Sequence, residues 1–431
     1  MKVGVRWWAG LVLPAVLAFV GQEALAAAKK KPRKPVPALA SKGGLEGEAA
    51  LEPFFRSLGQ EGATTRVLHF GDSHVSADYW TGELRRLFQE RFGDAGPGQV
   101  LPGKPWKSYR HAQAKSFSGG GWETVGVGRE EGDGLYGLSG AALSPTGEEG
   151  AAALEASFSE FRVQLLTLSQ GACVSVSVDG ITHFSGLLTP EESEAEAGEG
   201  CCHQCHLRRE PVEGTPFEVV TIGNAAPLDT SISHRLEIRD ACGGLSRILG
   251  VDLKSGRPGV IVDTLGINGA EIGSLGKWNP ELRRLLLAAA APALVVVSYG
   301  TNEMGRGDFD VAEYRGRVVE LLRGLREDLP GVAILVTGPI DRGARRKKAA
   351  AVIARNRPLV IRGLREAAAM AGCAFWDARA AMGGDGAIRR WGALRLAQRD
   401  QVHLTGPGYV KLAGLLHERL MLALEAWKRR P

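Results

Sequence analysis

The chain has 431 residues, of which 44% are hydrophobic and 23% are charged, and its formal net charge is +5. This length allows more than one domain, because a single hydrophobic core seldom grows beyond about 250–300 residues. The composition is that of a globular protein and excludes a disordered chain or a membrane bundle. Part of the positive charge lies in the run Lys29–Lys34, so the rest is near neutral and we expect no nucleic-acid partner.

Residues 1–26 have the pattern of a secretory signal peptide. Lys2 and Arg6 flank the start of an apolar stretch, Trp7–Val20, and an Ala-Leu-Ala cleavage pattern ends at Ala26. The stretch is shorter than the roughly 20 residues that a membrane span needs, although an uncleaved anchor is the alternative. Residues 27–59 form a basic, proline-containing linker and lead-in. We therefore expect a periplasmic or secreted protein with no stable membrane span after cleavage.

Strands and helices alternate in two separate parts of the chain. Val67–Phe70 is a short apolar strand, and Tyr79–Phe92 follows with apolar residues at helical spacing. Further strands are expected at 258–262, 294–299, 332–337 and 373–376, and helices at 279–290, 311–329, 345–371 and 407–428. Pro358 should kink or split the third of these helices. Strands that are apolar on both faces and alternate with helices predict a doubly wound parallel α/β/α sheet in residues 60–118 and 256–431.

Residues 119–255 have a different pattern. Val174–Val178 alternates apolar and polar side chains and is followed by Asp179-Gly180, which favours a hairpin turn. This alternation recurs and predicts an inserted antiparallel β-sandwich. Its aromatic residues could stack on sugars, although most such residues belong to a core; the candidates are Trp122, Tyr136 and Phe184.

Six cysteines are present, and the densest cluster is Cys201-Cys202-His203-Gln204-Cys205-His206. In an oxidising compartment we favour disulfides, with Cys242 or Cys173 as candidate partners. The alternative is a zinc site, because three thiols and two imidazoles are enough ligands for tetrahedral zinc; its candidate ligands are Cys201, Cys202, His203, Cys205 and His206.

Three segments with polar residues and glycines follow predicted strands, and a fourth polar segment precedes the last helix. Ser73 lies on the turn after the first strand, where a helix start can stabilise an oxyanion beside the hydroxyl. Gly269 and Asn302 follow the next two strands and can offer a backbone N–H and a side-chain amide to the same oxyanion. Taken singly, each residue could be a helix cap or a turn residue.

Asp400 and His403 lie three positions apart, just before the last predicted helix. This spacing allows a turn in which the carboxylate accepts a hydrogen bond from one ring nitrogen, while the other nitrogen takes the Ser73 proton. The four segments together predict a serine nucleophile with its base and orienting acid.

In this order, the segments resemble the SGNH/GDSL hydrolase family. The family's signature residues fall on Ser73, Gly269, Asn302 and His403, with Asp400 completing its Asp-x-x-His motif. The resemblance covers residues 60–118 and 256–431. It implies a flavodoxin-like fold, a Ser73–His403–Asp400 triad and an oxyanion hole formed by Ser73, Gly269 and Asn302, with no cofactor and no required metal.

Two departures from many family members resemble one branch of it. His74 follows the serine, and a long interval separates Ser73 from Gly269, as in bacterial peptidoglycan O-acetylesterases with an inserted domain like a carbohydrate-binding module. His74 and Glu303 flank catalytic residues and could line the pocket or form hydrogen bonds around the motif loops.

The resemblance implies an exported serine esterase that hydrolyses O-acetyl esters on a wall glycan, most simply peptidoglycan. The same residues could instead transfer acetyl groups between glycans, beside a separate membrane-bound donor. A non-catalytic glycan-binding protein is the third hypothesis, although the complete set of catalytic residues argues against it.

Overall fold

The computed structural model describes residues 44–127, 132–147, 150–168, 172–188, 205–241 and 247–430. The predicted signal peptide and residues 27–43 of the linker lie outside these ranges. Cys201, Cys202, His203 and Cys242 also lie outside them.

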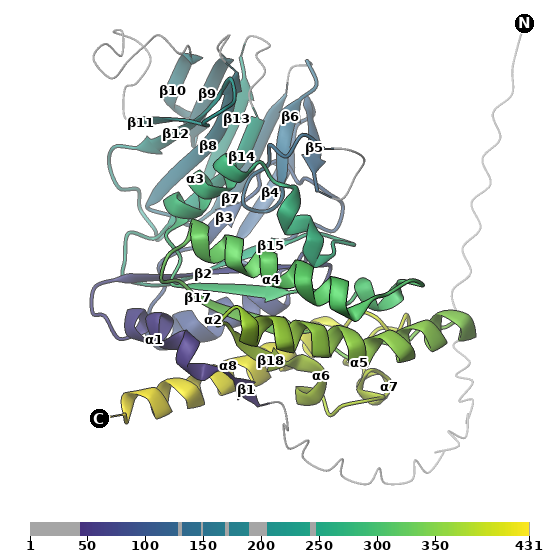
Figure 1. Cartoon of the computed structure of the whole chain (residues 1–431). Helices are drawn as coiled ribbons and strands as arrows, with labels where there is room; N and C mark the ends of the chain where they lie inside the picture. The colour runs from purple at the N-terminus through teal and green to yellow at the C-terminus, as the bar shows by residue number, and fades with distance from the viewer. Residues whose placement is uncertain are drawn as a thin grey trace, which may run out of the picture. The chain divides into compact units, whose positions relative to one another are not determined.

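A six-stranded sheet is the basis of the α/β part (Figure 1). Its spatial order is β1-β18-β17-β16-β2-β15, with β1 Leu45–Glu46, β2 Thr64–Gly71, β15 Gly259–Gly266, β16 Leu294–Ser298, β17 Ala333–Gly338 and β18 Ala374–Asp377. β1 is antiparallel to β18, and the other neighbours are parallel. Along the chain, the parallel strands have the flavodoxin-like order 2-1-3-4-5, which confirms the predicted fold class of this part. The strand order reverses between β2 and β16, and ligand sites form at the carboxyl ends of such strands.

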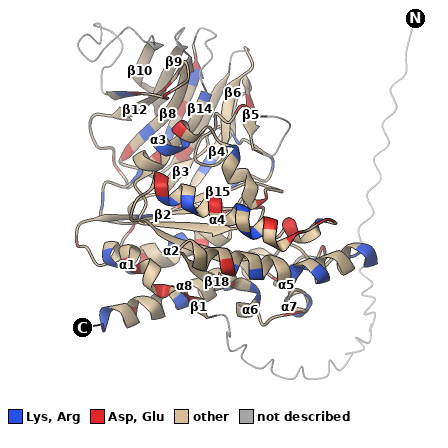
Figure 2. Cartoon of the chain, viewed as in Figure 1, with Lys and Arg blue, Asp and Glu red and all other residues tan. Residues whose placement is uncertain are grey.

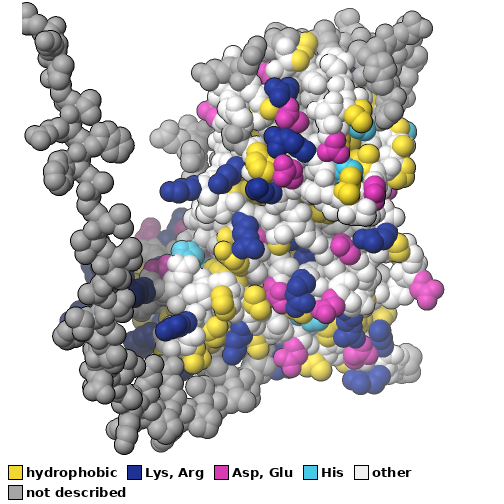
Figure 3. Space-filling view, turned by 180° about the vertical axis from the view of Figure 1, so that it is seen from behind, with side chains coloured by type: hydrophobic (Ala, Val, Ile, Leu, Met, Phe, Trp, Pro, Cys, Tyr) yellow, Lys and Arg dark blue, Asp and Glu magenta, His cyan; other side chains and the backbone are white. Residues whose placement is uncertain are grey.

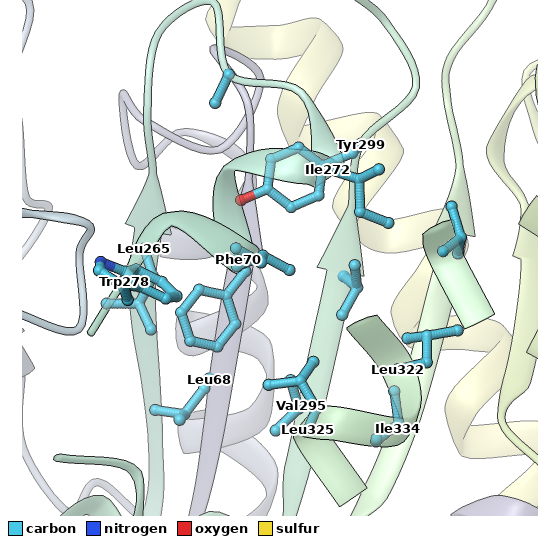
Figure 4. Close-up of a cluster of buried hydrophobic side chains, with 14 of the residues drawn as sticks. Leu68, Phe70, Leu265, Ile272, Trp278, Val295, Tyr299, Leu322, Leu325 and Ile334 are labelled. Atoms are coloured by element: carbon cyan, nitrogen blue, oxygen red, sulfur yellow. The ribbon is translucent and has the colours of Figure 1, made fainter. Parts of the chain in front are cut away.

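Helices cover both faces of this sheet. They are α1 Glu52–Leu58, α2 Trp80–Phe92, α3 Pro280–Ala290, α4 Val311–Asp328, α5 Lys347–Met370, α6 Ala378–Ala381, α7 Ala387–Ala393 and α8 Gly406–Lys428, with 3-10 turns η1 Glu48–Leu51, η2 Ile272–Lys277 and η3 Glu303–Gly305. Successive residues of β2 point to opposite faces, so Leu68 and Phe70 join one hydrophobic cluster and Val67 joins the other. Figure 4 shows Leu68 and Phe70 beside Leu265 and Val295 of the neighbouring strands.

Helix α5 is continuous through Pro358, so the predicted split does not occur. Proline removes one hydrogen bond from a helix interior. Packing compensates here, because Val360, Ile361 and Leu364 on the following turns are all buried in the cluster beneath the helix.

Two antiparallel sheets lie between α2 and β15 in the chain. One has the order β10-β9-β13-β7-β4, with β4 Ala114–Ser118, β7 Ala151–Ala156, β9 Ala172–Val178, β10 Ile181–Leu188 and β13 His234–Asp240. The other has the order β11-β12-β8-β14-β6-β5, with β3 beside β14; its strands are β3 Gly98–Val100, β5 Trp122–Gly126, β6 Ala141–Pro145, β8 Glu160–Leu168, β11 Cys205–Pro211, β12 Phe217–Asn224 and β14 Arg247–Lys254.

Side chains from both antiparallel sheets share one hydrophobic cluster, as Leu154 and Val176 from one sheet and Val163 and Ile222 from the other show. The sequence assigned β3 and β4 to the α/β part, but they pair with β14 and β7. We refer to residues 98–254 as the inserted β region.

The aromatic candidates of the inserted β region are mostly part of its structure. Tyr136 and Phe184 are buried, so neither can stack on a sugar, and their prediction as binding residues is wrong. Trp122 is half-buried and packs against the hydrophobic cluster between the two sheets. The simpler expectation, that most such residues belong to a core, holds for this group.

The surface carries both signs of charge. Figure 3 shows acidic and basic side chains interspersed with hydrophobic ones on the face opposite to that of Figure 1. Among the described residues, no helix combines the length and the apolar character that crossing a membrane requires.

Candidate active site

Ser73 lies two residues beyond the end of β2, on a turn that close packing of strand ends holds in place. A Cβ on Gly71 would lie 2.4 Å from Val75 Cγ2, and one on Gly266 of β15 would lie 2.3 Å from the amide nitrogen of Ser76. Only glycine fits these two positions without displacing the turn. Asp72 closes the turn by accepting a hydrogen bond from the His74 amide at 2.9 Å, and Ser73 remains half-exposed.

The structure brings Ser73, His403 and Asp400 together. Ser73 Oγ lies 2.9 Å from His403 Nε2, and His403 Nδ1 lies 2.7 Å from Asp400 Oδ2. The other carboxylate oxygen of Asp400 accepts hydrogen bonds from the backbone N–H groups of Val402 and His403. This is the orienter, base and nucleophile geometry that activates a serine hydroxyl.

The electrostatics keep Asp400 charged. Burial by itself would raise the pKa of this carboxyl, but the hydrogen bonds from the His403 ring and from two backbone amides outweigh it and lower the pKa below its usual value. The His403 and Asp400 side chains retain 34% and 41% of their exposure, so the site is open to a solute.

Gly269 and Asn302 lie on the loops that follow β15 and β16. Gly269 adopts φ +76° and is exposed, with no heavy atom within 4 Å of the position that a Cβ would take. Asn302 is half-exposed, and its Nδ2 donates to the Ala270 carbonyl at 2.7 Å, which leaves the second amide hydrogen for another acceptor. Both predicted oxyanion donors therefore lie on adjoining loops at the strand ends next to Ser73.

Glu303 connects these loops and does not line a pocket. It is buried, and its carboxylate accepts from the Ile272 amide at 2.9 Å and the Gly300 amide at 3.0 Å. Burial raises its pKa to about 7, although the backbone hydrogen bonds favour the charged form. Of the two roles that the sequence allowed, the structure favours hydrogen bonding around the motif loops.

His74 is also buried and supports the site from behind. Its Nδ1 lies 2.8 Å from the Tyr409 hydroxyl, and its ring centroid is 5.4 Å from that of His403. Burial lowers its pKa to about 4, so the ring is neutral at pH 7. The sequence does not indicate Tyr409 as the partner of His74, because the two residues lie 335 positions apart and meet only where α8 packs beside the turn after β2.

The Cys/His cluster is only partly within the described residues. Cys205 and Cys173 are both disulfide-bonded, so Cys205 has no thiolate for a metal, which contradicts its candidacy as a zinc ligand. His206 is an exposed residue of β11. The described residues contain no group of three or more potential ligands.

Comparison with known proteins gives a match to one family model and several similar solved structures. Residues 231–411 match the model of the GDSL-like lipase/acylhydrolase family. This segment includes Gly269, Asn302, Asp400 and His403, whereas Ser73 lies before the inserted β region. No curated protein matches the chain.

A solved structure described as a peptidoglycan O-acetylesterase is 26% identical, has a TM-score of 0.68, and covers 89% of this chain and 99% of its own. A lipase/acylhydrolase from Enterococcus faecalis is 17% identical, has a TM-score of 0.27, and covers 37% of this chain and 75% of its own. A family two carbohydrate esterase from Cellvibrio japonicus is 10% identical, has a TM-score of 0.28, and covers 76% of this chain and 98% of its own.

Proposed function

Because the chain carries a GDSL-like lipase/acylhydrolase domain, we propose that it is an exported serine esterase that removes O-acetyl groups from a cell-wall glycan, peptidoglycan in particular. The observation that carries the proposal is the hydrogen-bonded chain from Ser73 through His403 to Asp400 at the carboxyl edge of the sheet. The choice of peptidoglycan rests on the 26% identical O-acetylesterase, and export rests on the N-terminal sequence pattern.

The mechanism has two steps. His403 Nε2 takes the Ser73 proton, and Oγ attacks the acetyl carbonyl while the Ser73 and Gly269 backbone N–H groups and the Asn302 amide stabilise the oxyanion. The proton on His403 passes to the departing sugar oxygen. In the second step, His403 activates a water molecule, which releases acetate from Ser73. Asp400 holds the ring in the tautomer that both steps need.

The proposal is tested by measuring acetate released from O-acetylated peptidoglycan by the wild type, Ser73→Ala and Ser57→Ala. Ser57 is a matched control, because it lies on α1 away from the site and, among the described residues, its Oγ hydrogen-bonds only to Thr65 Oγ1, at 2.8 Å. We expect release by the wild type and the Ser57 variant, and a loss of several orders of magnitude for Ser73→Ala with an unchanged melting temperature.

Two other outcomes would change the assignment. Near-normal release by Ser73→Ala would refute the nucleophile. Hydrolysis of 4-nitrophenyl acetate without release from peptidoglycan would keep the serine mechanism and reject this substrate; acetyl transfer to an added acceptor glycan would then mark a transferase.

A further inference from the structure

A pocket of about 840 Å³, lined by five arginines, adjoins the turn that carries Asp400 and His403. Its lining residues come from the loop after β17, from α5, α6 and α7, and from the loop between α6 and α7. The charged ones are Arg342, Arg357, Arg379, Arg389, Arg390, Asp341 and Asp385. Five positive charges against two negative ones leave a net charge of +3. We call these lining residues the arginine pocket.

The arginine pocket lies at the same sheet edge as the triad. Gln401, the residue directly after Asp400, forms part of its wall, and the Gln401 carbonyl accepts a hydrogen bond from the Gly343 amide at 2.8 Å. Arg342 donates to the Thr301 carbonyl, one residue before Asn302. A chain molecule bound at Ser73 therefore has the arginine pocket as its immediate neighbour on the β17 and β18 side.

The ion pairs within the arginine pocket do not neutralise all of its positive charge. Asp341 and Asp385 both bind Arg357, at 2.7 and 2.9 Å, and Asp385 also binds Arg379. Arg389 is exposed and forms no hydrogen bond or ion pair with another described residue. The Nε–H groups of Arg342, Arg357 and Arg379 are buried without an acceptor in the described part of the chain.

The start of α5 adds to the positive electrostatic potential around the arginine pocket. This 24-residue helix has no acidic residue in its first turn and no side-chain cap, and its first two residues are Lys347 and Lys348. Basic residues at a helix N-terminus are unfavourable for the isolated helix, because that end already carries partial positive charge. Figure 2 shows basic residues gathered at this end of α5 and around α6 and α7. An anion bound there would relieve this repulsion.

We propose that the arginine pocket is an anion subsite that binds carboxylate groups on the glycan substrate next to the ester. Planar guanidinium groups recognise carboxylates in a bidentate manner, which gives both affinity and orientation. This inference rests on the proposed function, since peptidoglycan carries free carboxylates on its stem peptides. The enzyme therefore prefers an acidic acetylated glycan to a neutral one.

The test compares wild type with Arg389→Glu and with the control Arg323→Glu; Arg323 is also exposed, lies on α4, and its side chain has no partner among the described residues. The substrates are O-acetylated peptidoglycan, the same material with its carboxyl groups amidated, and 4-nitrophenyl acetate. For Arg389→Glu we expect kcat/KM to fall about 5- to 10-fold on the first substrate and to be unchanged on the other two. The control should behave as wild type throughout.

A binding measurement separates this inference from the proposed function. A fluorescent glutamate oligomer should bind wild type at 50 mM NaCl, and Arg389→Glu should weaken its Kd about 5- to 10-fold. This result would support the subsite even if peptidoglycan proved not to be the substrate. Equal losses on all three esters, or an unchanged Kd, would overturn it. Displacement of the oligomer by inorganic phosphate but not by acetate would assign the subsite to phosphate groups instead.

Discussion

Two clusters of charged side chains differ in how completely their hydrogen bonds are satisfied. Arg66 of β2 lies 2.7 Å from Asp252 of β14 and 2.6 Å from Asp263 of β15, and all three residues are buried. This cluster joins the inserted β region to the central sheet, and four guanidinium–carboxylate hydrogen bonds fill it. The Ser73–His403–Asp400 cluster is half-exposed, so its serine hydroxyl and imidazole face a space that a substrate can enter. A closed charge cluster therefore holds elements of the fold together, whereas an open one is available for chemistry.

The largest expected effect is a loss of activity when the open cluster, Ser73–His403–Asp400, is broken. Asp400→Asn removes the carboxylate that orients His403, and we expect kcat to fall by about 10⁴-fold because the imidazole then takes the wrong tautomer. The melting temperature should change little, since the carboxylate is partly exposed. Steady-state kinetics on 4-nitrophenyl acetate and thermal unfolding would check both points. A kcat within tenfold of wild type would exclude Asp400 from the triad.

Breaking the closed cluster around Arg66 should reduce stability and leave the activity of the folded enzyme unchanged. Arg66→Met leaves Asp252 and Asp263 as buried carboxylates without their partner, which should lower the free energy of unfolding by about 3–5 kcal/mol. The remaining folded enzyme should keep kcat near the wild-type value. Urea unfolding and active-site titration would separate the fraction folded from the activity per folded molecule. A stable variant with reduced kcat would contradict the division between the two clusters.

The sequence predicts the open cluster better than the closed one, because local patterns mark its members. Ser73 follows an apolar strand directly, and Asp400 and His403 share one turn. The Arg66 partners lie 186 and 197 positions away, so only the folded chain brings them together. The continuity of α5 through Pro358 is also a tertiary effect, because packing on the sheet outweighs the local cost of proline.

Asn302 and Glu303 are neighbours on one loop, and they allow an exposed catalytic group to be compared with a buried structural one. Asn302 is half-exposed, and replacing it with Ala should reduce kcat about 100-fold by removing one oxyanion donor, with stability nearly unchanged. Glu303→Gln changes an adjacent buried group that accepts two backbone N–H bonds, so it should lower the melting temperature. Kinetics and thermal unfolding of both variants would check this. Equal effects of the two changes on kcat would show that the loop acts as a unit.

The last prediction concerns stability in mild acid. Burial lowers the pKa of His74 to about 4 and those of His69 and His111 to about 3, from an ordinary value of 6.5. The unfolded chain therefore binds more protons than the folded protein below pH 6.5. The contribution of these three histidines to stability is fully present above pH 6.5 and is lost as the pH falls toward 4. Glu303 opposes this trend, because its raised pKa of about 7 means that the folded protein keeps a proton that the unfolded chain loses above pH 4.5.

Three histidines outweigh one carboxyl, so the urea midpoint should be lower at pH 5 than at pH 7. Each buried histidine adds up to about 1.4 kcal/mol per pH unit in this window. His111→Gln removes one of them and should reduce the slope of stability against pH, whatever its effect on stability itself. A midpoint independent of pH in both wild type and His111→Gln would show that the buried histidines are not kept neutral by the fold.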